Sequence, residues 1–72
     1  MSIMKERGNM NLTNREVEVM ELICNGDSNN EIANKLIIST STVKAHVMSI
    51  IEKLQAKNRA GAVYIFCTHK FS

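Results

Sequence analysis

The sequence predicts an all-α fold, a four-helix bundle, on three observations. The chain of 72 residues contains no proline and only three aromatic side chains, and 44% of its residues are apolar. The apolar residues recur at helical spacing between polar capping residues. A chain this short buries only about 60% of the surface that its unfolded form exposes, so its core must be compact. Residues 1–11 show no periodicity and are expected to form a flexible N-terminal arm before one domain, residues 12–72. The expected helices cover residues 14–25, 28–36, 40–55 and 58–68.

Two capping boxes mark the starts of the first two helices. Thr13 can accept the backbone N–H of Glu16 while the Glu16 carboxylate reaches back, and Ser28 and Glu31 have the same spacing. Gly26 supplies the left-handed residue that ends the first helix. The starts of both helices and the end of the first are therefore expected from local signals.

The second and third helices are joined by about three residues, a loop so short that the helices must cross steeply, as in a helix-turn-helix motif. Ala33 is the small residue expected at the crossing, Ile38 is expected to plug the core, and Val43 to fill the junction. Many such motifs have glycine in the turn where this chain has Ile37, which predicts a turn without a left-handed residue. The third helix then buries an apolar stripe of period 3.6, formed by Val43, Val47, Ile50, Ile51 and Leu54.

The last helix has more apolar residues than one core needs. Ala60, Val63 and Cys67 are expected to face inward, which leaves three apolar side chains toward a different side. An exposed apolar line of this size on a small monomer predicts a two-fold dimer contact. The residues of this predicted dimer interface are Ala62, Ile65 and Phe66. The alternative is that Phe66 folds over the end of the core.

The outward face of the third helix carries a narrow, mostly polar ridge, which is what a helix that reads the major groove of DNA needs. Lys44 can donate to guanine O6 and N7, and Ser41 to a base edge or a phosphate. Ala45 and Met48 can touch a thymine methyl group. The simpler alternative is an ordinary solvated helix face.

The charges are divided unevenly along the chain. Residues 1–33 contain three basic and six acidic side chains, whereas residues 34–72 contain six basic and one acidic. The basic half holds the third helix and is where an acidic partner is expected, nucleic acid being the commonest.

Four segments carry a family pattern: LTNREVEVMELI at residues 12–23, GDSNNEIA at 26–33, LIISTSTVKAH at 36–46 and NRAGAV at 58–63. In register, they resemble the LuxR-type (GerE-like) DNA-binding domains, over about Leu12 to Phe66. The resemblance implies a four-helix bundle, a third helix that reads DNA and dimerisation through the fourth helix. It also implies regulation of transcription, often as the output domain of a response regulator.

Site residues follow from the resemblance position by position. Lys44 and Ala45 correspond to base-contacting positions, and Ser41 and Met48 to positions that contribute in some members, although Met48 replaces an often basic or polar residue. Asn30 stands where the family usually has lysine near a phosphate. The residues expected to contact DNA phosphates are Asn29, Asn30, Thr40, Thr42 and His46. His46 lies between the core stripe and the outward ridge, so packing is the alternative for it.

Glu16 lies on the apolar side of the first helix, where an unpaired carboxylate is costly. We expect it to form a partly buried structural pair with Arg59, which would lock the first helix to the start of the fourth. The alternative is that Glu16 serves only in the capping box.

The sequence lacks the parts of an enzyme, and neither a cofactor nor a metal is expected. His46 and His69 have no suitably spaced partners for a metal site, and Cys24 and Cys67 have no second pair to build a zinc site. The two cysteines fit an intracellular compartment, and no apolar run approaches the roughly 20 residues of a membrane span. The protein is therefore expected in the cytoplasm.

The expected partners are double-stranded DNA with a pseudo-palindromic site, a second copy of the chain and RNA polymerase. Two alternatives stay open: a sigma-factor promoter-reading region, which shares this helix order, and a protein-interaction module that uses the apolar face of the last helix. The initial Met1 favours a stand-alone regulator over the output domain of a longer protein.

Overall fold

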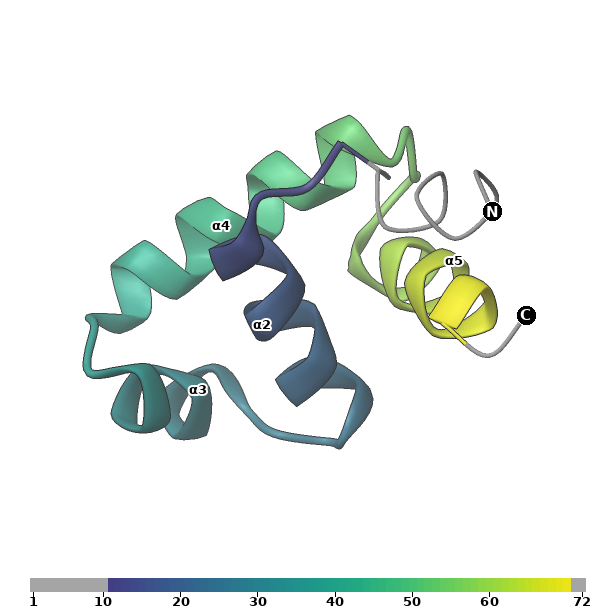
Figure 1. The fold of residues 1–72 in the computed structure, drawn as a ribbon. Coiled ribbons are helices and arrows are strands. Elements are labelled where there is room, and N and C mark those ends of the chain that lie inside the picture. Colours follow the sequence, from purple (N-terminus) through teal and green to yellow (C-terminus); the bar gives the residue numbers. More distant parts are fainter. Residues whose placement is uncertain (1–10, 71–72) are drawn as a thin grey trace.

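The computed structural model describes residues 11–70, which form four helices and no strand. In chain order the helices are α2 (Asn14–Cys24), α3 (Asn29–Leu36), α4 (Thr40–Lys53) and α5 (Arg59–Lys70). The longest, α4, packs against the other three (Figure 1). The predicted all-α fold is confirmed, and no predicted helix end differs from the observed one by more than two residues. The predicted arm, residues 1–11, lies outside the described residues apart from Asn11.

Both predicted capping boxes are present. The backbone N–H of Glu16 donates to Thr13 Oγ1 at 3.1 Å, and the backbone N–H of Thr13 donates to Glu16 Oε1 at 2.9 Å. At the start of α3, the backbone N–H of Glu31 donates to Ser28 Oγ at 3.2 Å, and the backbone N–H of Ser28 donates to Glu31 Oε1 at 2.7 Å. Each box satisfies N–H groups that have no partner within the helix, so these starts are set by residues three apart in the sequence.

The end of α2 also follows the prediction. Gly26 has a φ of 95°, in the left-handed region, and this bend lets the N–H of Asp27 donate to the carbonyl oxygen of Leu22 at 3.0 Å. The arrangement is a Schellman motif, which satisfies carbonyl groups left over at the helix end.

The prediction for the turn between α3 and α4 is wrong. Ile37 adopts the left-handed conformation, with φ 58° and ψ 52°, although its side chain is β-branched. This bend brings the N–H of Ile38 to 3.0 Å from the carbonyl oxygen of Ala33 and lets the Ile38 side chain pack against the core, while 88% of Ile37 remains exposed. A left-handed residue of this kind costs roughly 1–2 kcal/mol, which the closed turn must offset.

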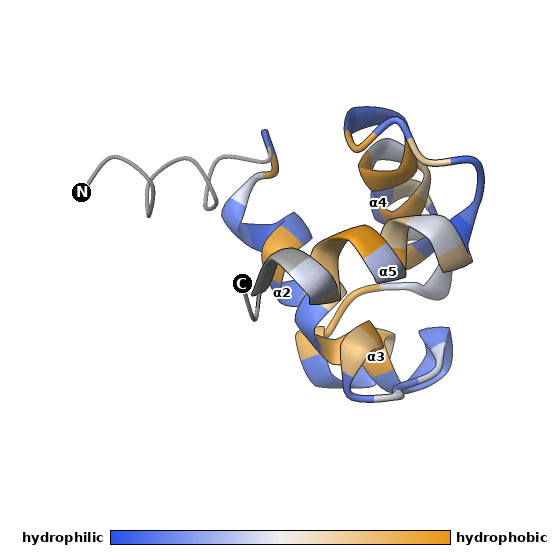
Figure 2. Ribbon diagram, turned by 90° about the vertical axis from the view of Figure 1, so that its right-hand side faces the viewer, coloured by the Kyte–Doolittle hydropathy of each residue, from blue (hydrophilic) through white to orange (hydrophobic). Residues whose placement is uncertain are grey.

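The core lies between all four helices, each of which carries hydrophobic and hydrophilic segments (Figure 2). Ala33 and Val43 are buried where α3 crosses α4, as predicted. The largest fully buried side chains are Met20, Ile32, Ile50, Val19 and Val43. These contacts hold one face of α4 against the core and leave its opposite face in solvent.

The predicted inward face of α5 is only partly right: Val63 packs against the core as predicted, but the buried residues of this helix are others. Ala62 and Phe66 are 1% and 7% exposed and belong to the core, whereas Ala60 is exposed. The buried line of Ala62 and Phe66 lies one residue, or about 100° around the helix, from the expected line of Val63 and Cys67. Ala62 and Phe66 therefore stabilise the domain itself, as the alternative for Phe66 had it, and of the predicted dimer interface only Ile65 remains partly exposed.

A disulfide joins Cys24, the last residue of α2, to Cys67 in α5. Cys67 lies on the flank of the buried line of α5 and Cys24 packs partly against the core, so tertiary packing brings the two together. The two cysteines were expected to fit an intracellular compartment, where disulfides are rare, so their bond across 43 residues removes them as support for that expectation.

The helices show two further features of the chain. Among the residues that the structure describes, no helix has both the length and the hydropathy to cross a membrane. Within the same part of the chain, no three His, Cys, Asp or Glu side chains gather as a metal site.

Candidate nucleic-acid interface

The face of α4 that points away from the core carries the predicted ridge. Ser41, Lys44 and Ala45 are exposed, and Met48 is 68% exposed. The helix begins at Thr40 and is capped by Ser39, whose Oγ accepts the backbone N–H of Thr42 at 3.1 Å. The four predicted base-contacting residues are thus brought together on one exposed surface near the amino end of α4.

Four of the five predicted phosphate-contacting residues come from the first turns of α3 and α4. Asn30 and Thr42 are exposed, and Asn29 and Thr40 are half-buried. The Thr42 hydroxyl lies 2.9 Å from that of Ser39, so it already takes part in the helix cap. His46, the fifth residue of this set, is half-buried on the side of α4.

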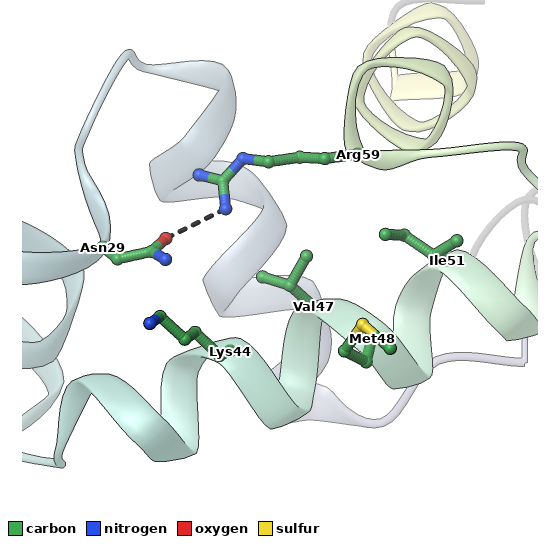
Figure 3. Close-up of a pocket in the computed structure, with 6 residues that line it drawn as sticks. All are labelled: Asn29, Lys44, Val47, Met48, Ile51 and Arg59. Atoms are coloured by element: carbon green, nitrogen blue, oxygen red, sulfur yellow. Dashed lines mark hydrogen bonds between the residues drawn. The ribbon is translucent and has the colours of Figure 1, made fainter.

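A groove of about 380 Å³ runs beside the ridge, between α4 and the starts of α3 and α5 (Figure 3). Its lining residues are Asn29, Lys44, Val47, Met48, Ile51 and Arg59. The Arg59 guanidinium reaches across from the first residue of α5, and its Nη1 donates to Asn29 Oδ1 at 2.9 Å. Asn29 was expected at a phosphate and Arg59 in a structural pair with Glu16, and no feature of the sequence predicted that Asn29 and Arg59 meet.

The predicted pair of Glu16 with Arg59 is wrong, although the predicted burial of Glu16 is confirmed at 4% exposure. Lys53 Nζ donates to Glu16 Oε1 at 2.9 Å, and Ser49 Oγ donates to Oε2 at 2.8 Å. The last turns of α4 lie over the start of α2, whereas Arg59 lies over the start of α3. Ser49 and Lys53 are four residues apart and therefore share one side of α4, which was the available signal.

Glu16 is held as a carboxylate. Burial by itself raises the pKa of Glu16, but the hydrogen bonds from the Thr13 backbone, from Lys53 and from Ser49, with the charge of Lys53, outweigh burial and hold the pKa below its usual value. The carboxylate therefore acts as a fixed anchor between α2 and α4.

The basic lysine and arginine side chains that the structure describes, between residues 11 and 68, fall into two groups. Three are paired with carboxylates: Arg15 with Glu18, Lys35 with Asp27, and Lys53 with Glu16. Lys44, Lys57 and Arg59 have no carboxylate partner within the described part of the chain. Two of these three uncompensated cations line the groove beside α4.

Comparison with known proteins gives one consistent family. A model of the family described as "Bacterial regulatory proteins, luxR family" matches residues 10–66. The chain is 46% identical over 52 residues to the transcriptional regulatory protein DesR of Bacillus subtilis, covering 72% of this chain and 26% of DesR. It is 48% identical over 52 residues to the CsgBAC operon transcriptional regulatory protein of Escherichia coli, covering 72% and 24%.

A third relative extends the match. The response regulator protein VraR of Staphylococcus saprophyticus is 43% identical over 68 residues, which covers 92% of this chain and 32% of VraR. The chain thus spans between a quarter and a third of the length of these curated relatives.

Proposed function

Since the chain belongs to the luxR family of bacterial regulatory proteins, we propose that it binds double-stranded DNA and regulates transcription, with α4 as the helix that reads the major groove. The observation that carries the proposal is the exposed ridge of Ser41, Lys44, Ala45 and Met48 on α4. The relatives are named as transcriptional regulatory proteins and a response regulator, in agreement with this role.

The dimensions of α4 suit the groove. Its 14 residues give a rod about 21 Å long, and the major groove, about 12 Å wide, admits one helix. Lys44 then donates to guanine O6 and N7, Ser41 donates to a neighbouring base edge, and Ala45 and Met48 contact thymine methyl groups. Contacts to the phosphates on either side come from Asn29, Asn30, Thr40, Thr42 and His46.

We propose that two copies bind together through α5, on a pseudo-palindromic site with half-sites roughly 34 Å apart. Burial of Ala62 and Phe66 moves this contact to the outer side of the helix, where Ile65 is partly exposed and Tyr64 is 72% exposed. RNA polymerase is a further partner under this proposal, and the cytoplasm is the place of action because the chromosome lies there.

A titration of labelled duplexes tests the proposal. The protein should bind random-sequence DNA with an affinity that falls steeply as salt rises, through counterion release. On a site selected from random duplexes, Lys44→Ala should lose about 1–3 kcal/mol of binding free energy if Lys44 reads a guanine. Lys57→Ala removes an uncompensated lysine outside α4 and is the matched control. Equal binding of the selected site by wild type and Lys44→Ala would contradict the assignment of α4.

The alternatives from the sequence analysis lose support. A protein-interaction module relied on an apolar face that included Ala62 and Phe66, both of which are buried. A sigma-factor region shares the helix order, but the family comparison favours the luxR family over residues 10–66. We propose no catalytic activity for the domain, since the curated relatives are regulators.

A further inference from the structure

The groove beside α4 has a rim of donors above an apolar floor. Val47 and Ile51 form the floor on α4, and the polar side chains come from three helices (Figure 3). Arg59, from α5, and Lys44, from α4, both extend toward Asn29 at the start of α3. Three segments that are distant in the sequence thus direct donors into one place.

The rim is unbalanced in charge. A guanidinium has five N–H donors, and the one partner of Arg59 in the described residues is the amide oxygen of Asn29, which is neutral and leaves the positive charge uncompensated. That bond uses the acceptor of Asn29, so its amide N–H groups remain donors. Lys44 adds an ammonium with no carboxylate partner among the described residues. The rim is therefore suited to bind an anion with several hydrogen-bond acceptor atoms.

The position of the groove beside α4 indicates that the anion is a phosphate of the DNA backbone. A helix in the major groove has a phosphate strand on each side, and contacts to those strands position the protein without reading sequence. Lys44 lies at the boundary of the ridge and the groove, so the strand on the α5 side of α4 passes along the rim. The apolar floor excludes water and strengthens hydrogen bonds to a charged group above it.

We propose that this groove is a phosphate-binding site, in which Arg59, held in place by Asn29, donates to a phosphodiester of the DNA strand beside α4, while the positive charge of Lys44 at the same rim attracts that phosphate and its N–H groups remain available to a base. The site rests on the proposed DNA binding and adds Arg59 to its contacts. An arginine suits this place because its planar fork can hold two phosphate oxygens while one N–H stays bonded to Asn29.

Two variants and a control test the site by titration of a selected and a random duplex at several KCl concentrations. Arg59→Gln should lower the affinity for both duplexes about fivefold per bound subunit at roughly 0.15 M salt, because the loss of one phosphate contact changes the slope of log K against log salt by about 0.9 for each subunit. Asn29→Asp should weaken both at least as much, since its carboxylate would neutralise Arg59 and repel a phosphate. Arg15→Gln makes the same substitution at a paired arginine and should leave the slope unchanged.

The outcomes separate this site from the proposed function. A wild-type slope for Arg59→Gln and Asn29→Asp, with wild-type protein that binds DNA, would overturn the phosphate site alone. Weaker binding only to the selected duplex would make Arg59 a base-reading residue and would also overturn the site. Absence of salt-dependent binding by the wild type would overturn the proposed function and the site with it. Thermal unfolding of Asn29→Asp should match the wild type, because the new carboxylate pairs with Arg59, so lost binding in this variant is not lost folding.

Discussion

The two sides of α4 differ in whether the charged side chains there are paired with an opposite charge. On the α2 side, the buried carboxylate of Glu16 receives hydrogen bonds from Ser49 and Lys53, and the two opposite charges compensate each other. On the α5 side, the Arg59 guanidinium meets only the neutral amide of Asn29 among the described residues. We call the first the closed side and the second the open side.

The difference follows from burial. A carboxylate as buried as Glu16 must be paired and hydrogen-bonded, because an isolated buried charge is very costly. A half-buried guanidinium keeps part of its hydration and can remain uncompensated. One helix can therefore be fixed to the core on its closed side and keep an available positive charge on its open side.

The disulfide should give the largest effect, because it ties α5, which carries Arg59, to α2. Its two cysteines are 43 residues apart, and closing such a loop in the unfolded chain corresponds to about 4 kcal/mol of stability in the chain-entropy description. Reductant should lower the free energy of unfolding, measured in urea, by about this amount. The variant with Cys24→Ser should show no response to reductant, and a response of this variant equal to that of the wild type would assign the effect elsewhere.

Opening the closed side should give the next largest effect. Glu16→Gln removes the charge that pairs with Lys53 and weakens three hydrogen bonds, so the free energy of unfolding should fall by about 2 kcal/mol. The Lys53 side chain is 32% exposed, which limits the loss. Glu18→Gln, at an exposed pair, is the control and should stay within about 0.5 kcal/mol in urea unfolding. Equal losses in the two variants would contradict the distinction between buried and exposed pairs.

Acid should also lower the free energy of unfolding through Glu16, because it protonates the same carboxylate. The folded-state pKa of Glu16 lies below its ordinary value of 4.5, so the unfolded chain takes up the proton first as pH falls. The stability from Glu16 is therefore fully present well above pH 4.5 and is lost as pH falls through the lower, folded-state pKa. Urea unfolding from pH 7 to 3 should show the advantage of wild type over Glu16→Gln shrinking in this range. An advantage that stays constant with pH would contradict the lowered pKa.

The smallest effect on stability is expected on the open side. Arg59→Gln removes one charge-assisted hydrogen bond to Asn29, so the free energy of unfolding should fall by about 0.5–1 kcal/mol. Thermal or urea unfolding of Arg59→Gln and Glu16→Gln, each compared with the wild type, measures the two losses in free energy of unfolding. A loss as large as that of Glu16→Gln would mean that both sides are structural and would remove the contrast between them.

The parts of the fold that depend on neighbours in the sequence could be predicted. The capping boxes at Thr13 and Ser28 and the left-handed Gly26 involve residues within five positions, and all three are confirmed. The placement of Lys44 on an exposed ridge follows from the period of the buried stripe of α4. These features require no knowledge of how distant segments pack.

Apart from the left-handed turn at Ile37, which is local, the wrong predictions concern contacts between distant segments. In α5 most residues from Ala60 to Cys67 are apolar, so periodicity alone does not select an inward face, and packing against the other helices decides it. The partner of Glu16 and the partner of Arg59 depend on which end of α4 lies over α2 and which over α3. The disulfide depends in the same way on the meeting of α2 and α5.

The left-handed turn at Ile37 has a consequence of handedness. Its φ of 58° and ψ of 52° are nearly the mirror image of an ordinary helical residue, and its side chain extends into solvent without a role in the core. A D-amino acid prefers this region for the same steric reason that an L-amino acid avoids it. Position 37 is thus a place where the chirality of a single residue opposes the shape of the motif, and where a chemically synthesised chain can carry a mirror-image residue between the two helices of the helix-turn-helix.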